Sequence, residues 1–142
     1  MKPLPHINKT PENEEQWFAT LVRLARYLRS PQGCPWDRKQ TVQSFARFLA
    51  EEAQELDDAV KDNDHEHIIE EFGDMFFCAL MTAAVAEDEG WFQLRDALEK
   101  AHEKMIRRHA HIFGEHTAET SDDAVRVWER VKAEEKKGRK KT

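Results

Sequence analysis

Apolar residues recur every three or four positions along four stretches of the chain. This spacing places them on one side of a helix, whereas a half-buried strand would alternate apolar and polar residues. A fifth helix is expected from about Ser121, and no stretch is convincing as a strand. The pattern predicts an all-α fold, a helical bundle of about four core helices with an extra C-terminal helix. The four core helices are expected over residues 12–29, 41–63, 66–86 and 94–108.

Turn signals separate these stretches. Two prolines and a glycine between Ser30 and Pro35 stop the first helix and predict a loop that continues to Gln40. Thr41 is suited to cap the second helix. Asp64 follows Asp and Asn in a turn and is suited to cap the third helix.

The third expected helix is apolar on nearly every side between Met75 and Ala86. A helix that is apolar all round is buried on several sides. In a domain of this size, such burial indicates either the centre of a bundle or the interface of a dimer.

With 142 residues, the chain is long enough for one domain with its own hydrophobic core. Its 39% hydrophobic and 35% charged residues are typical of a helical protein with polar outer faces. We expect an irregular N-terminal arm over residues 1–11, a single helical domain over 12–135 and a basic flexible tail over 136–142.

Charge and targeting signals narrow the expected partners. No apolar run is long enough to cross a membrane, and the first residues lack the features of a signal peptide. We therefore expect a cytoplasmic protein without a membrane partner. The net charge of −6 argues against nucleic acid as the main partner. Cys34 and Cys78 lie far apart and suggest neither a disulfide framework nor a zinc site.

Two pairs of acidic residues lie on the sides of the second and third helices that must be buried. Glu52 and Glu55 share the apolar stripe of the second helix. Glu71 and Asp74 share a stripe of the third helix that also contains Met75. Carboxylates are seldom buried unless a cation, a metal ion or a shared proton compensates their charge. Two such pairs on consecutive helices indicate a site rather than a solvated surface.

Four converging carboxylates without histidine or cysteine form a site of hard oxygen ligands. Such a site suits Mg²⁺, or Mn²⁺ in its place, better than Zn²⁺ or copper. Mg²⁺ held by carboxylates keeps coordination positions for water and for substrate phosphates. The residues thus favour a metal-dependent enzyme that acts on a phosphate ester or anhydride.

Two other functions remain open on the residues alone. A bundle that activates oxygen at a carboxylate-bridged pair of metal ions also places acids on core helices, but it normally has two Glu-x-x-His motifs. This chain offers one good match, from Glu99 to His102. A non-catalytic, dimerising helical module would neutralise the acids with Lys and Arg instead of a metal ion.

A loop tryptophan and a basic helix end are further candidates for function. Trp36 could stack on a nucleobase, or it could close one end of the bundle. Lys104, Arg107 and Arg108 lie where cations stabilise the dipole of the fourth helix, so their position alone predicts a solvated helix end. The alternative is a clamp for a polyphosphate, because Lys and Arg bind phosphate oxygens.

Several short motifs occur in a characteristic order along the chain. They are Gly-Cys-Pro-Trp-Asp at 33–37, Gln-Thr at 40–41, EEAQEL from residue 51, EEFGD from residue 70, EDEGWF from residue 87 and EKMIRRHAHIFG from residue 103. Together they resemble the MazG-type nucleotide pyrophosphohydrolases of the all-α NTP pyrophosphatase superfamily. The resemblance extends from about residue 17 to 114, and Val-Trp-Glu-Arg-Val-Lys at 127–132 also resembles a later family segment.

The resemblance implies an all-α enzyme that works as a homodimer or a larger oligomer. The implied reaction is hydrolysis of NTP or dNTP to NMP or dNMP and pyrophosphate, with Mg²⁺ as the cofactor. The implied metal-binding and catalytic residues are Glu52, Glu55, Glu71 and Asp74. The substrate contacts that we expect are Trp36, Lys39, Lys104, Arg107 and Arg108.

Two positions depart from the family pattern. Ala101 and His102 stand where many members have Asn or Ile-Asn, and Ala110 stands between two histidines where many have proline. Neither position belongs to the acidic pairs, but both could alter the choice of substrate.

Overall fold

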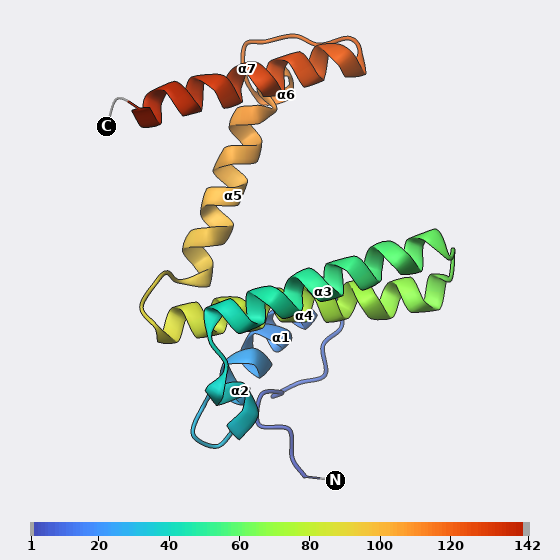
Figure 1. Ribbon diagram of the computed structural model, residues 1–142, viewed down its shortest axis with the longest axis vertical. Coiled ribbons are helices and arrows are strands. Elements are labelled where there is room, and N and C mark those ends of the chain that lie inside the picture. Colours follow the sequence, from blue (N-terminus) through green and yellow to red (C-terminus); the bar gives the residue numbers. More distant parts are fainter. Residues whose placement is uncertain (1, 141–142) are drawn as a thin grey trace. The chain divides into compact units, whose positions relative to one another are not determined.

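The computed structural model describes residues 2–140, and the regular structure of these residues is entirely helical (Figure 1). This confirms the all-α fold class. The helices are α1 (Glu14–Leu28), α2 (Pro35–Lys39), α3 (Val42–Lys61), α4 (His65–Asp88), α5 (Leu94–Arg108), α6 (Ala110–Phe113) and α7 (Ser121–Lys140).

The long helices begin and end close to the expected positions, because the end signals work as expected. Thr41 Oγ1 accepts a hydrogen bond from the Ser44 amide at 3.0 Å, and Ser44 Oγ accepts one from the Thr41 amide at 2.9 Å. This capping box begins α3. Asp64 Oδ1 accepts a hydrogen bond from the His67 amide at 3.3 Å and caps α4.

Residues 136–140, which we expected to be flexible, are helical in α7. Lysine and arginine are good helix formers, so a basic composition does not oppose this extension. Residues 141 and 142 of the expected tail, like Met1 of the expected arm, lie outside the described residues. Residues 2–13 form no helix.

Two short helices occur outside the expected ones, and the first of them, α2, occupies the segment that we expected to be a loop. α2 begins at Pro35, whose fixed φ and missing N–H suit the first turn of a helix. α6 has four residues and follows directly after His109. Helices of this length are too short to show a helical period in the sequence. For α2, the proline and glycine signals before it therefore led to the prediction of a loop.

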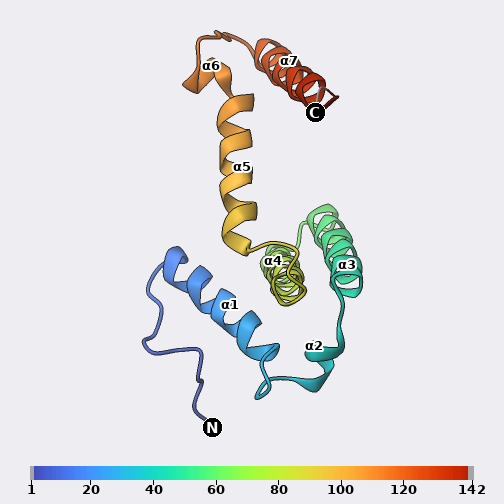
Figure 2. The same ribbon diagram turned by 90° about the vertical axis from the view of Figure 1, so that its left-hand side faces the viewer.

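The chain divides into two compact units after Leu94. The first unit contains α1 to α4. Its α3 and α4 lie side by side in opposite directions, and α1 packs against α4 (Figure 2). The second unit contains α5 from Arg95 onwards together with α6 and α7, and α6 packs against α7. The buried core of the first unit is formed by Ala25, Phe45, Leu80, Met81, Ala84 and Val85.

α4 is the central helix of the first unit. Its C-terminal half is buried on several sides, as expected for the segment from Met75 to Ala86, and Met81 and Val85 are almost completely buried. Burial against α1 and α3 accounts for this apolar segment within one chain. None of the helices in residues 2–140 has both the length and the apolar character that a membrane span requires.

Gly33 allows the chain to turn tightly from α1 into α2. Its amide donates a hydrogen bond to the carbonyl of Ser30 at 2.9 Å, and the next amide, of Cys34, donates one to the carbonyl of Leu28 at 2.8 Å. A Cβ atom at Gly33 would lie 2.3 Å from the carbonyl oxygens of both Tyr27 and Leu28. Only glycine fits this approach without a backbone shift.

We predict that Gly33→Ala lowers the free energy of unfolding by about 1–3 kcal/mol, because the added methyl group must displace backbone. Gly73→Ala on α4 is the matched control. Its Cβ would meet nothing within 4 Å, so helix propensity should raise stability by about 0.5–1 kcal/mol. Urea denaturation in EDTA measures both changes, and a shift of the same sign and size in the two variants would contradict the close-approach argument.

Candidate metal centre

Three of the four predicted acidic residues converge between α3 and α4. Glu52 and Glu55 lie one turn apart on α3, and Glu71 lies on the neighbouring α4. One carboxylate oxygen of each lies within 4.8 Å of the others. The side-by-side packing of the two helices turns two separate sequence clusters into one site.

Burial makes this arrangement costly. Glu71 is only 7% exposed, and Glu52 is half-buried. Oε2 of Glu52 and Oε2 of Glu71 are both buried and have no hydrogen-bond partner. A buried polar atom without a partner costs about 1–3 kcal/mol, and a charged one costs more. The site therefore favours a proton or a cation between these oxygens.

The close carboxylates raise each other's pKa. Burial, followed by the charge of Glu55 and the closeness of the Glu71 carboxylate, with which it can share a proton, raises the pKa of Glu52 to about 7. A shared hydrogen bond with Glu71, together with the charge of Glu71, raises the pKa of Glu55. Burial and the neighbouring negative charges both disfavour the ionised form of these carboxyl groups.

His67 is a neighbour of the site that the sequence interpretation missed. Its Nε2 lies 2.9 Å from Oε1 of Glu71. A hydrogen bond to Glu71 raises the pKa of the imidazole. His67 precedes Glu71 by four residues, and this spacing on a helix was the signal that could have identified it.

Asp74, the fourth predicted acid, does not join this group of close oxygens. It lies three residues after Glu71 on α4 and is exposed. Its negative charge still contributes to the raised pKa values of Glu52 and Glu55. Burial, with smaller contributions from the charges of Glu52 and Asp74, also raises the pKa of the Cys78 thiol.

The donor set fits a hard divalent cation. Oxygens bound to one Mg²⁺ ion at about 2.1 Å lie at most about 4.2 Å apart. A spread of 4.8 Å therefore requires only small side-chain rotations. Among residues 2–140, no histidine belongs to this group. Glu99 and His102, the one match to a di-metal motif, are exposed on α5.

Trp36 of α2 packs against α3 at Phe45 and Phe48. Its ring stacks on Phe48 with centroids 5.7 Å apart and meets Phe45 edge-on at 6.0 Å. Trp36 nevertheless remains 54% exposed. Phe48 precedes Glu52 by one helical turn. Lys39, at the end of α2, is exposed.

The other predicted substrate contacts lie in the second unit, where two of them are already paired. Arg107 Nε and Arg108 Nη2 donate hydrogen bonds to the carboxylate of Glu135 at 3.1 and 3.0 Å. Arg108 is buried, and its Cζ lies 5.0 Å from the centre of the Trp128 ring. Lys104 is exposed. A cleft of about 640 Å³ within this unit is lined by these cations and also by Lys100 and Arg139.

Comparisons with known proteins agree with the order of the motifs. The profile of the MazG nucleotide pyrophosphohydrolase domain matches residues 40–113. The crystal structure of a MazG-related protein from Thermotoga maritima superposes with a TM-score of 0.66 at 36% sequence identity. The match covers 78% of this chain and 97% of that chain.

Two curated relatives extend the comparison. The nucleoside triphosphate pyrophosphohydrolase/pyrophosphatase MazG of Thermotoga maritima is 39% identical over 125 residues, which is 88% of this chain and 47% of that protein. The uncharacterized protein YabN of Bacillus subtilis is 42% identical over 119 residues, which is 84% of this chain and 24% of that protein. The chain thus spans between about a quarter and about a half of these relatives' lengths.

We predict that Glu71→Gln stabilises the metal-free protein. The substitution removes one of the converging charges, and its amide can donate to the carboxylate oxygen of Glu52 that has no partner. A gain of about 1 kcal/mol would raise the melting temperature in EDTA by a few degrees. Added Mg²⁺ should stabilise the wild type but not the variant. Glu70→Gln, at the exposed neighbouring position, is the control and should leave both responses unchanged.

We also predict that the metal-free protein loses stability as the pH rises from about 4.5 to about 7. The folded state binds a proton at Glu52 more tightly than the unfolded state, because its pKa is raised from 4.5 to about 7. The raised pKa values of Glu55 and His67 act in the same direction. Glu52→Gln should flatten the dependence on pH, as measured by denaturation in EDTA. Stability that instead rises through this range would contradict the repulsion between carboxylates.

Proposed function

Because the chain belongs to the MazG nucleotide pyrophosphohydrolase family, we propose that it hydrolyses NTP or dNTP to NMP or dNMP and pyrophosphate. The observation that carries the proposal is the group of three glutamates, in which two buried oxygens have no hydrogen-bond donor. This group lies within the matched segment, residues 40–113. A folded protein tolerates such a group when a ligand compensates it.

The proposed cofactor is Mg²⁺, for which Mn²⁺ can substitute. Glu52, Glu55 and Glu71 would hold it, and Asp74 would join through a rotation of its exposed side chain. When bound, Mg²⁺ neutralises charge on the phosphates and lowers the pKa of water. His67 would keep Glu71 oriented, since its Nε2 binds one oxygen of that carboxylate and leaves the other for the site.

The exposed carboxylates of the acidic group are suited to accept a proton from the water that attacks the substrate. We propose that Glu55, or its exposed neighbour Glu51, accepts a hydrogen bond from the attacking water and then its proton. The water oxygen bonds to the α-phosphorus while the bond from that phosphorus to the α–β bridging oxygen breaks. Pyrophosphate leaves with that oxygen, so that the products are NMP and pyrophosphate.

Each unit, taken by itself, contains residues that we propose as contacts for a nucleotide. In the first unit, the exposed surface of Trp36 would stack on the base, and Lys39 would contact a phosphate. In the second unit, Lys104 and Arg107 have exposed side chains suited to phosphate oxygens. Arg107 and Arg108 would both have to exchange the carboxylate of Glu135 for a phosphate oxygen.

Two features of the chain support further parts of the proposal. The family match crosses the division at Leu94, which supports a single MazG domain over residues 12–135. Ile69 and Phe72 of α4 are 73% and 54% exposed, and large apolar residues on a helix surface support a homodimer or a larger oligomer. A non-catalytic dimerising module would share these features but would not turn over nucleotides.

We predict release of pyrophosphate from a panel of NTPs and dNTPs in the presence of Mg²⁺ and none in EDTA. Glu71→Gln should reduce the rate by more than about 100-fold, because it removes a proposed ligand. Glu70→Gln on the same helix is the matched control and should retain the rate. Near-normal turnover by Glu71→Gln would refute the metal role. Orthophosphate as the product would move the reaction to another phosphorus, and a folded wild type without turnover would favour the binding module.

A further inference from the structure

The residues of α2 alone do not stabilise its position in the fold. It has only five residues, none of them buried, and its N-cap residue Cys34 makes no side-chain capping bond. A helix this short is unstable in isolation, because few backbone bonds compensate the cost of nucleation. Contacts from elsewhere in the fold must therefore fix the position of α2.

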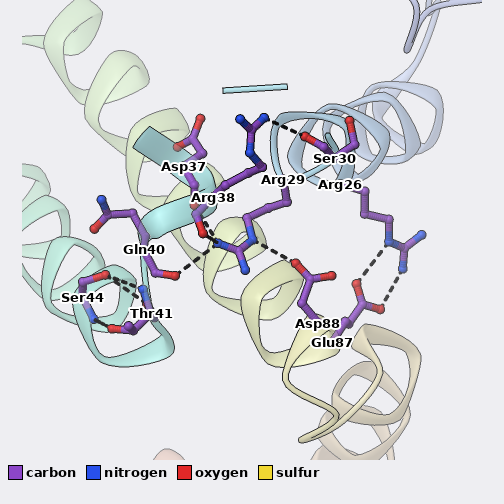
Figure 3. Close-up of polar contacts among 10 residues, drawn as sticks. All are labelled: Arg26, Arg29, Ser30, Asp37, Arg38, Gln40, Thr41, Ser44, Glu87 and Asp88. Atoms are coloured by element: carbon purple, nitrogen blue, oxygen red, sulfur yellow. Dashed lines mark hydrogen bonds and ion pairs between the residues drawn. The ribbon is translucent and has the colours of Figure 1, made fainter. Parts of the chain in front are cut away.

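Arg29, just after the end of α1, supplies those contacts (Figure 3). Its Nη1 donates to the carbonyl oxygens of Asp37, Arg38 and Gln40 at 2.7, 3.0 and 3.1 Å. Its Nε donates to Oδ2 of Asp88 at 2.9 Å. One guanidinium thus binds the carbonyl end of α2 and the end of α4 at the same time.

The environment of Arg29 requires a guanidinium. Its side chain is only 9% exposed, while that of Asp88 is 52% exposed and supplies the counter-charge. The planar guanidinium presents several N–H groups in fixed directions, whereas a lysine ammonium is a compact point charge. A cation is also favourable at the C-terminal end of a helix, where carbonyl groups lack partners.

Two neighbours complete the attachment of α2. Arg38 Nη1 donates to the carbonyls of Ser30 and Pro31, both at 3.1 Å, so that the two segments hold each other reciprocally. Gln40 Nε2 donates to the carbonyl of Trp36 at 3.1 Å. The backbone of Trp36 is therefore fixed through the same end of α2 that Arg29 binds.

The attachment determines where the indole of Trp36 lies. One face stacks on Phe48, one turn before Glu52, while 54% of the residue stays exposed. We propose that Arg29 is a positioning residue for the base of the nucleotide: it holds α2 so that Trp36 offers its free surface at a fixed place beside the acidic group. This inference rests on the function proposed above and assigns to Arg29 a role in the choice of base.

The first test is spectroscopic and needs no activity. The protein contains four tryptophans, so fluorotryptophan labelling gives four ¹⁹F resonances, and Trp36→Phe identifies that of Trp36. Arg29→Lys keeps a positive charge beside Asp88 but loses the fork of donors. It should shift or broaden the Trp36 resonance and leave the other three in place. Arg26→Lys is the matched control, because Arg26 lies in the last turn of α1, close to Arg29 in the chain, but binds Glu87.

The second test uses catalysis on a substrate with and without a base. Arg29→Lys should raise the KM of the preferred nucleotide roughly tenfold, the order of one weakened base–aromatic stack, with kcat within about twofold. The ratio of kcat/KM values between nucleotides with different bases should also fall in Arg29→Lys. Inhibition by inorganic tripolyphosphate, which has no base, should keep its wild-type constant. Arg26→Lys should retain both wild-type values.

The outcomes separate the inference from the proposed function. An unmoved Trp36 resonance in Arg29→Lys, or an equal loss of affinity for tripolyphosphate, would overturn the positioning role. If Arg29→Lys does not fold, Gln40→Ala removes a single bond to the Trp36 carbonyl and must shift the same resonance for the inference to stand. A wild type that releases no pyrophosphate would refute the proposed function and the role in base choice, while the ¹⁹F spectra would still decide whether Arg29 positions Trp36.

Discussion

Two carboxylate oxygens, of Glu52 and Glu71, are buried between α3 and α4 without a hydrogen-bond donor, and the rest of the first unit must compensate for them. The apolar half of α4 provides this compensation, because Met81 and Val85 pack with Phe45 and Ala25 in the core. Apolar burial of about 25 cal/mol per Å² is favourable enough to hold the two helices together despite the repulsion. The acidic group thus lowers the stability of the fold at the place where a cation is expected to bind. Active sites commonly lower stability in this way.

The segment between α1 and α3 illustrates a second way of holding a site. Its glycine lets the chain approach the carbonyl end of α1, and Arg29 then binds the carbonyl end of α2. Neither contact depends on a large buried surface. Backbone carbonyls and one buried guanidinium define the place of Trp36, which has most of its packing on a single side. Polar contacts of this kind are directional, and they fix position more sharply than apolar packing alone.

In the second unit, a buried arginine stabilises the structure through an aromatic ring and a carboxylate. Arg108 is buried against Trp128 and pairs with Glu135, and a hydrogen bond from Arg108 is the main cause of the lowered pKa of that carboxyl group. The pair balances the charge of the buried guanidinium. A phosphate group, like a carboxylate, can accept two parallel hydrogen bonds from a guanidinium, which is compatible with the proposed exchange of Glu135 for a phosphate.

The sequence by itself determined the fold class, the five long helices, the caps at Thr41 and Asp64, and the helix faces on which the acidic pairs lie. These follow from periodicity and local hydrogen bonds, which act over a few residues. Tertiary structure decided the rest. It left Asp74 outside the close group, formed α2 through Arg29, and paired Arg108 with Glu135, 27 residues away. Contacts between residues far apart in the chain depend on how helices pack, and no local pattern specifies which partner a buried charge will meet.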